Sequence, residues 1–191
     1  MKQLSGNFEI NRYGLNVRLV QKSDAEFIVA LRTHSYNSRY LHADGLTVEK
    51  QISWIEQYKQ REASGEDYYF LFTYEGERVG VIRLYHIHEC DFHCGSWAFS
   101  DEAPSFCGIA GAVIGREIAF GELGKTIELN CEDGIDARNL NVQRFMKQMG
   151  LKMTGERYEG ETKYLVGELT KEDFENNKHK IIRFFPKQYQ S

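Results

Sequence analysis

Five side chains that can carry a proton or bind a metal lie within nine consecutive residues: His86, His88, Cys90, His93 and Cys94. Histidine titrates near neutral pH, so one of these imidazoles suits a general base that takes a proton from an amine. Nitrogen and sulfur are also zinc ligands, and strand alternation predicts that His86, His88 and Cys90 share one side of an extended strand. The spacing matches no standard zinc motif, so we expect no metal. Histidines that only pack in the sheet are the third interpretation.

A run of small residues, 107–111, follows Ser105 at the predicted start of a helix. Unpaired amide groups and the helix dipole favour an anion such as phosphate at a helix N-terminus. Small residues at this position also permit tight packing against a neighbouring element. From the residues alone, both interpretations stay open.

These segments belong to a chain of ordinary domain size. It has 191 residues, a formal net charge of −4, and 41% hydrophobic residues. The acidic balance disfavours a nucleic-acid partner, and the apolar content is enough for a packed core. The sequence has no run of 18 apolar residues and no secretory leader pattern, so we expect no membrane association, a cytoplasmic location and reduced cysteines.

Hydrophobic periodicity predicts a single α/β (α+β) domain, residues 1–191, with a mixed sheet because hairpins occur near both ends. The predicted strands are residues 17–20, 68–74, 79–87, 96–100, 126–131, 152–158 and 163–169. The predicted helices begin after Ser23 and Thr47 and span residues 108–123, 137–149 and 173–179.

Several segments resemble the Gcn5-related N-acetyltransferase (GNAT) superfamily. Residues 118–124, IAFGELG, resemble the end of its central helix, and residues 76–87 resemble its third strand. Asn139, followed eleven residues later by Gly150 and Leu151, resembles its segment after the next buried strand. The resemblance covers residues 15–175 and implies a mixed, mostly antiparallel sheet of six to seven strands flanked by helices.

The resemblance implies direct transfer of an acyl group from acyl-CoA to a primary amine, through a tetrahedral intermediate. The strand at residues 96–100 would pair with the pantetheine arm, and one of its N–H groups would polarise the thioester carbonyl. The amides of residues 107–111 would hold the diphosphate. The implied donor-binding residues are Trp97, Ala98, Phe99, Cys107, Gly108, Ile109, Ala110, Gly111 and Asn139.

Two positions depart from the family pattern. Ser105 stands where relatives carry Gln or Arg in the diphosphate loop; in a frame shifted by two residues, Phe106 stands at the first small position of that loop and Gly108 at the last. Met146 stands where many relatives carry a tyrosine general acid, and a thioether cannot donate a proton. Either another group or water protonates the thiolate, or the thiolate leaves unassisted. A non-catalytic CoA-binding sensor module therefore stays open as an alternative.

Two residues are candidates for the catalytic base that deprotonates the amine. His86 is the first candidate because it lies near the end of the third strand, where relatives line the acceptor pocket. Glu128, on the following buried strand, is the rival candidate.

For the acceptor, the resemblance implies Arg32, Tyr40, Arg83 and Tyr85 as binding residues. Arginine meets a diphosphate through two parallel hydrogen bonds, and tyrosine stacks on a base or sugar. Residues 51–55 and 68–70 resemble acyltransferases of surface-polysaccharide type, so the first expectation is a nucleotide-linked amino sugar. The alternative acceptor is a protein N-terminus. The aromatic segment at residues 183–186 suggests a surface for a partner subunit, so a homodimer is a further hypothesis.

Overall fold

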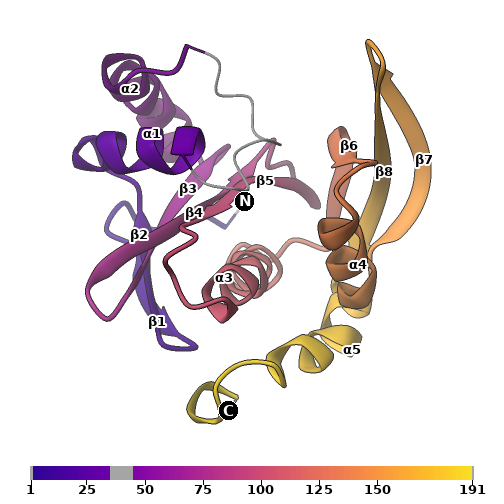
Figure 1. Ribbon diagram of the computed structural model, residues 1–191. Helices are drawn as coiled ribbons and strands as arrows, with labels where there is room; N and C mark the ends of the chain where they lie inside the picture. Colours follow the sequence, from indigo (N-terminus) through magenta and orange to yellow (C-terminus); the bar gives the residue numbers. More distant parts are fainter. Residues whose placement is uncertain (1, 35–44, 191) are drawn as a thin grey trace.

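The computed structural model of the chain describes residues 2–34 and 45–190, and a single mixed sheet organises them (Figure 1). Its strands are β1 (Glu9–Arg12), β2 (Leu15–Leu19), β3 (Tyr68–Tyr74), β4 (Glu77–Tyr85), β5 (Asp91–Phe99), β6 (Ile127–Asp136), β7 (Lys152–Glu159) and β8 (Thr162–Thr170). Their order is β1-β2-β3-β4-β5-β6-β8-β7. Among these described strands only β5 and β6 pair in parallel, so the mixed, mostly antiparallel sheet is confirmed.

The described residues form eight strands, one more than the upper expectation. The additional strand is β1, a four-residue edge strand in which Ile10 is the only apolar residue. An edge strand this short and polar carries no alternation that sequence analysis can detect.

The helices are α1 (Ala25–His34), α2 (Val48–Ser64), α3 (Phe106–Glu117), α4 (Leu140–Met149) and α5 (Lys171–Ile182). Helices α1 and α2 cover one face of the sheet, where Ile28 and Ile55 pack with Val81 of β4. The opposite face packs against α3, with Phe99 and Phe120 in its core. None of the described helices is long and apolar enough to cross a membrane.

Local chemistry explains where two of the helices begin and end. The Thr47 hydroxyl accepts from the Lys50 amide at the start of α2, and Gly65 ends the helix with a left-handed φ of 80°. The Asn139 side chain accepts from the Val142 amide at the start of α4. Gly150 then ends α4 in the same left-handed conformation, with a φ of 109°.

The segment between β4 and β5 differs from the sequence prediction. His86 adopts a left-handed φ of 47°, and the His88 amide donates to the carbonyl of Asp91 at 3.0 Å, so the chain turns. The prediction that His86, His88 and Cys90 lie on one side of an extended strand is therefore wrong. Because the turn is tight, β5 begins at Asp91, five residues earlier than expected.

The parallel pair β5–β6 is short. Its register contains two pairs, Asp91 with Ile127 and Phe92 with Glu128, and beyond them the two strands separate (Figure 1). A bulge in β5 accompanies the separation: the register to β4 shifts between Val81 and Arg83, and Ser96 has a φ of 49°. Bulges of this kind re-aim backbone groups and are common beside active sites.

Candidate active site

The separated strands leave backbone groups that the sheet does not pair. The other edge of β5 bonds to β4, and the other edge of β6 bonds to β8. Past Phe92 and Glu128, the facing edges of the two strands have no strand partner, so water or a ligand must satisfy their N–H and C=O groups. An extended ligand with amides of its own fits between two such edges in the way an added strand does.

The first turn of α3 lies beside this opening and offers backbone donors. Ser105 is its N-cap and makes no side-chain capping bond. The Cys107 amide donates to the carbonyl of Pro104 at 2.8 Å. From Ile109 onward, amides belong to the helical ladder, so the open donors are those of Ser105, Phe106 and Gly108. Among the five amides expected to bind the diphosphate, that of Gly108 is still open. The amides of the other four residues already donate within the protein; these residues are Cys107, Ile109, Ala110 and Gly111.

Phe99 explains why small residues are required at the start of α3. A Cβ added to Gly111 would overlap the Phe99 ring, and so would one added to Gly80 of β4. Gly108 lies in ordinary contact with the same side chain, since a Cβ added there would be 3.7 Å from Phe99 Cβ. The side chain of Phe99 therefore packs the sheet against α3, and only its backbone faces the opening between β5 and β6.

The side chain of Trp97 spans the space between β5, α3 and α4. Its indole N–H donates to the carbonyl of Gly108 at 3.0 Å. Its ring lies 5.1 Å from that of Phe145 on α4, measured between centroids. Both rings are partly buried and pack against the core. Trp97 thus lies beside the opening, where the resemblance predicts a contact with acyl-CoA. Its side chain also bonds to the first turn of α3.

Asn139 and Met146 belong to this same region, at the start of α4 and within it. Asn139 caps the helix, so its side-chain oxygen is already hydrogen-bonded. Met146 is buried, and its sulfur lies 3.4 Å from Nη2 of Arg116. Because a thioether carries no proton to donate, Met146 supplies packing rather than acid catalysis.

Glu128, the rival base, is buried in an ion pair at the point where β5 and β6 separate. Its Oε1 accepts from Nη2 of Arg116 at 2.6 Å, and the side chains of Arg116 and Glu128 are 4% and 2% exposed. Burial raises the pKa of Glu128, and the charge of Arg116 opposes that rise. A carboxylate held by a guanidinium and closed to solvent is poorly placed to meet an amine.

His86 lies in a cluster of three rings where β4 turns into β5. Its ring centroid is 5.1 Å from that of Tyr85 and 5.3 Å from that of His93. His86 is exposed, whereas His93 and Tyr85 are buried. His93 directly follows Phe92, the last β5 residue paired with β6, so the cluster adjoins the opening. A left-handed backbone is uncommon in residues other than glycine, and such outliers concentrate at functional sites.

A metal centre finds no support in this window. Among the residues that the structure describes, no three His, Cys, Asp or Glu side chains converge in a way that could hold an ion. Cys90 is exposed on the turn, and Cys94 lies in β5, opposite Leu84. The turn at His86 separates side chains that an extended strand would have brought together.

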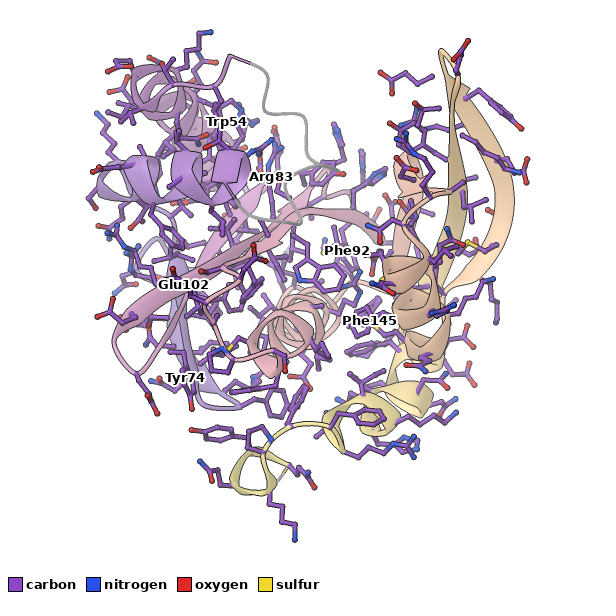
Figure 2. The ribbon with its side chains drawn as sticks, viewed as in Figure 1. Trp54, Tyr74, Arg83, Phe92, Glu102 and Phe145 are labelled. Carbon is purple, nitrogen blue, oxygen red and sulfur yellow. The ribbon has the colours of Figure 1, made fainter. Side chains whose placement is uncertain are left out.

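Arginines and aromatic rings gather on the face of the sheet that α1 and α2 cover. Arg83 donates from Nε to Asp67 at 2.8 Å, and Arg61 donates to the same carboxylate at 2.9 Å. The Arg83 guanidinium lies 4.9 Å from the centre of the Trp54 ring and 4.8 Å from that of Tyr85 (Figure 2). Such cation–π contacts fix the orientation of the guanidinium.

Arg32 joins this group from α1. The Tyr69 hydroxyl is fully buried, which raises its pKa, and the charge of Arg32 opposes that rise. Trp54 connects the two parts, because its ring stands edge-on to Tyr69 at 5.7 Å. The structure therefore brings together three of the four predicted acceptor residues, Arg32, Arg83 and Tyr85. Tyr40 lies outside the described residues.

Sequence reasoning missed two members of the site, Asp67 and Arg61, which are the partners of Arg83. Cross-strand register brings two positions together, since Tyr85 pairs with His93 and Tyr69 pairs with Arg83. Asp67 carries a detectable signal, because an aspartate directly before the aromatic run of β3 is an unusual polar residue beside buried positions. Register itself cannot be derived from composition.

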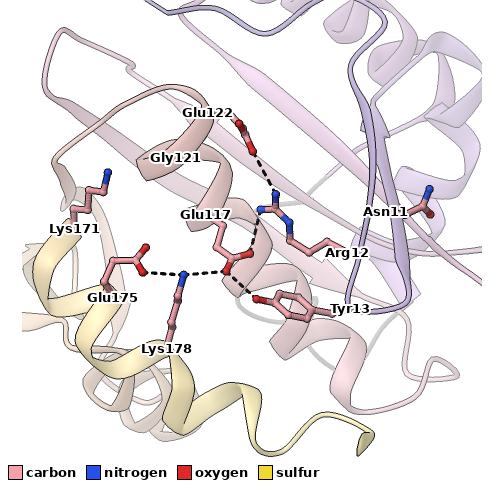
Figure 3. A pocket seen from close by; sticks show the side chains of 9 residues that line it. All are labelled: Asn11, Arg12, Tyr13, Glu117, Gly121, Glu122, Lys171, Glu175 and Lys178. Carbon is pink, nitrogen blue, oxygen red and sulfur yellow. Dashed lines mark hydrogen bonds and ion pairs between the residues drawn. The ribbon is translucent and has the colours of Figure 1, made fainter. Parts of the chain in front are cut away.

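The surface has two hollows, the first outside the region described above and the second at its edge. One of about 540 Å³ lies between the β1–β2 turn, the end of α3, and α5 (Figure 3). In it, Glu117 accepts from Arg12 at 3.1 Å, from Tyr13 at 2.8 Å and from Lys178 at 3.2 Å. The other, of about 390 Å³, lies along α2 and is lined in part by Trp54. The first hollow is thus lined by a network of ion pairs and hydrogen bonds that links the β1–β2 turn, α3 and α5.

Known structures share this architecture. Apo FdhC, described as a nucleotide-linked sugar GNAT, superposes with a TM-score of 0.79 at 28% identity, covering 94% of this chain and 99% of FdhC. A ribosomal-protein-S5-alanine acetyltransferase from Vibrio fischeri gives a TM-score of 0.68 at 15% identity, covering 88% and 99% of the two chains. A spermidine N-acetyltransferase from Vibrio cholerae gives 0.68 at 12% identity, covering 86% and 98%. No curated protein sequence matches the chain.

The sequence itself matches a family as well. Residues 15–152 match the acetyltransferase (GNAT) domain, a span that runs from β2 to the start of β7. It contains the separated strands, the first turn of α3, and the arginine and histidine clusters. The chain therefore belongs to the GNAT acetyltransferase family and is an acyl-CoA-dependent N-acyltransferase.

Proposed function

We propose that the protein transfers an acyl group from acyl-CoA to the amino group of a nucleotide-linked amino sugar, as in the synthesis of surface polysaccharides. The observation that carries the proposal is a cluster of arginines and aromatic rings on the α1/α2 face of the sheet, called the acceptor surface below. Arg61 and Arg83 meet one buried carboxylate, Asp67, beside the ring of Trp54, and a third guanidinium, that of Arg32, acts on Tyr69 through its charge. The 28% identity with a nucleotide-linked sugar GNAT supports the same choice.

The donor fits the opening between β5 and β6. Acyl-CoA brings the activated thioester and a pantetheine arm whose amides can bond to strand edges. The backbones of Trp97, Ala98 and Phe99 lie along the open edge of β5, after the bulge at Ser96. The connection to α3, residues 100–105, contains no lysine or arginine, so main-chain donors must hold the diphosphate. Asn139 lies at the end of the same opening, where it fixes the start of α4.

His86 is the proposed base. An ammonium has no free electron pair, so the amine must lose a proton before it attacks the thioester carbonyl. His86 is exposed at the end of β4, beside the arginine cluster and beside the start of the open strand edges. The buried ring of His93 packs against that of His86, with 5.3 Å between their centroids. A backbone N–H at the β5 bulge would stabilise the oxyanion.

The charge of the acceptor surface discriminates between the two candidate acceptors. A protein N-terminus and the lysine-rich segments of ribosomal proteins are basic, and they would require acidic side chains in the cleft. Here the buried carboxylate of the acceptor surface, Asp67, is already bonded by Arg61 and Arg83. A nucleoside diphosphate meets the opposite requirement, since guanidinium groups bind phosphate oxygens and aromatic rings stack on a base.

The acceptor class is tested by thiol release. Purified enzyme is mixed with acetyl-CoA and with a panel of nucleotide-linked amino sugars, the corresponding free amino sugars, spermidine, and a basic peptide. We expect release with at least one nucleotide-linked sugar and, from the loss of one or more charged hydrogen bonds, roughly tenfold less with its free sugar. Turnover of the peptide or of spermidine without turnover of any sugar nucleotide would overturn the proposed acceptor.

The role of the arginine cluster is tested with two variants on one strand. Arg83→Gln removes a guanidinium from the acceptor surface, and Arg78→Gln removes one from the opposite end of β4, where it faces Phe27. Hydrogen bonds to charged groups contribute about 1.5–3 kcal/mol, so we expect Arg83→Gln to raise KM for the sugar nucleotide about 10–150-fold. KM for acetyl-CoA should stay unchanged, and Arg78→Gln should behave like the wild type.

The role of His86 is tested by its pH dependence. Loss of a general base lowers rates about 10²–10⁴-fold, so His86→Gln should reduce kcat by at least that lower figure at about pH 7. Because the amine deprotonates unaided as the pH rises, the deficit should shrink toward about pH 9. A deficit that is the same at every pH would assign His86 to binding or packing instead. His88→Gln, an exposed histidine on the same turn, is the matched control.

A further inference from the structure

The C-terminal end of the chain returns to the first residue of α3. After α5, the chain passes beneath α3 and ends in a short 3₁₀ turn, Lys187–Tyr189 (Figure 1). Phe106, the first residue of α3, lies 6.3 Å from the ring of Phe185 and 5.8 Å from the ring of Tyr189. Phe106 and Tyr189 are nearly parallel, at 27°. Residues 185–189 therefore cover the side chain that begins the donor-binding turn.

Residues from the N-terminal half of the chain also pack around residues 185–189 and Phe106. The ring of Tyr13 lies 5.1 Å from Phe185, and the ring of Tyr74 on β3 lies 5.5 Å from Phe106. Gly14 in the β1–β2 turn has a φ of 78°, and a Cβ there would overlap the ring of Tyr189. A hydrogen bond to Tyr189 raises the pKa of Tyr74 to about 12. These contacts thus fix the position of the Tyr189 ring.

The segment is also ordered by its own hydrogen bonds. The side-chain amide of Gln190 donates to the carbonyls of Arg183 and Phe185, at 3.1 and 2.7 Å. Phe185 is 3% exposed, whereas its neighbour Phe184 is 61% exposed. The expectation that residues 183–186 present aromatic surface to a partner subunit is therefore corrected for Phe185, which packs within its own chain.

The start of α3 needs such a support. Most helices are fixed at their N-terminus by a side chain that bonds to the first amides. Ser105 makes no such bond, which leaves those amides open for an anion but gives them no local anchor. The side chain of Phe106 is 9% exposed and is clamped among rings of the C-terminal segment, so it fixes the direction of the first turn.

We propose that Phe185 and Tyr189 are positioning residues for acyl-CoA: by packing on Phe106, they hold the open amides of α3 in the orientation that receives the diphosphate. The inference rests on the donor site in the proposed function and is independent of which amine is acylated. It assigns a role to a segment that lies beyond the family match, which ends at residue 152.

Calorimetric titration with coenzyme A alone tests the proposal, together with steady-state kinetics. An aromatic pair contributes about 0.5–1.5 kcal/mol beyond its buried area, so Tyr189→Ala should raise Kd for coenzyme A about 2–13-fold. KM for acetyl-CoA should rise in step, while kcat and the amine KM stay unchanged. Tyr189→Phe should restore binding, because the ring remains. Phe184→Ala is the matched control, since it removes an exposed ring from the same segment.

Three results would overturn the proposal: an unchanged Kd in Tyr189→Ala, an equal rise in Phe184→Ala, or a loss confined to kcat. Tyr189→Leu, which retains apolar bulk, provides a second test if the alanine variant does not fold. We expect its Kd for coenzyme A to lie between those of the wild type and Tyr189→Ala. Circular dichroism confirms that each variant is folded. Because coenzyme A is titrated without an amine, failure of the sugar proposal leaves this test intact.

Discussion

The buried pair of Arg116 and Glu128 allows a sharp prediction about stability. The guanidinium Nη2 lies 2.6 Å from the carboxylate, and both side chains are almost completely buried. Within the described part of the chain, Arg116 Nε and Glu128 Oε2 are buried and have no hydrogen-bond partner. The pair therefore bears the desolvation cost of two charges without satisfying all of their polar atoms.

Arg116→Met should destabilise the protein strongly. The substitution keeps apolar volume but leaves Glu128 as an uncompensated buried charge, and breaking such a pair costs about 3–5 kcal/mol. A domain of this size loses about 2–4 °C in Tm per kcal/mol, so the expected fall is about 6–20 °C. In contrast, Arg116→Met combined with Glu128→Leu removes both charges and both orphaned atoms. We expect that double variant to be as stable as the wild type or more stable.

The pH dependence of the single variant has a defined sign. Burial raises the pKa of Glu128 in the folded protein, and loss of the opposing guanidinium raises it further. A carboxyl whose folded pKa is raised favours the folded state below its unfolded pKa, near about 4.3, and loses that contribution as the pH rises through its folded pKa. The deficit of Arg116→Met should therefore shrink as the pH falls from about 7.5 to about 5.

Urea unfolding followed by circular dichroism measures all three proteins at both pH values. Lys22→Met, which breaks the exposed pair with Glu56, is the control and should cost less than about 1 kcal/mol. The reasoning is refuted if Arg116→Met loses no more than the control. It is also refuted if the double variant is as unstable as the single one, since volume rather than charge would then explain the loss.

Two further predictions concern packing and reactivity. Gly111→Ala should cost about 1–3 kcal/mol in urea unfolding because its Cβ would overlap the Phe99 ring, whereas Gly121→Ala, with open space around it, should be close to neutral. Burial raises the pKa of Cys94 to about 12, so at about pH 8 it remains a protonated thiol. Mass spectrometry after brief alkylation should show modification of the exposed Cys90 before that of the half-buried Cys94, and equally rapid labelling of both would contradict this prediction.

The sheet and its helices were largely predictable because their signals are local. Alternation and turn residues located the β3–β4 and β7–β8 hairpins, and Gly65 and Gly150 located two helix ends. The misses share a cause. Strand β1 is too polar to show a pattern, and β5 begins early because His86 turns the chain through a conformation that its residue type does not demand.

The site was less predictable because it depends on contacts between distant elements. Arg83 was a candidate by resemblance, but its fixed orientation comes from Asp67 and Trp54, which lie far from it in the sequence. Glu128 was attractive as a carboxylate on a buried strand. Only the three-dimensional position of Arg116, on α3, shows that its charge is already paired.

Helix α3 is held at both ends by the terminal segments of the chain, and this explains how a helix with an uncapped start can present ordered amides. At its far end, Glu117 accepts from Tyr13 at 2.8 Å and from Lys178 at 3.2 Å (Figure 3). At its beginning, Phe106 packs on the C-terminal rings. Tyr13 takes part in both, since its hydroxyl bonds to Glu117 while its ring packs on Phe185. Burial raises the pKa of Tyr13, so the hydroxyl stays a donor throughout the physiological range. Tyr13 thus links the N-terminal hairpin and the C-terminal segment, and both of these pack against α3.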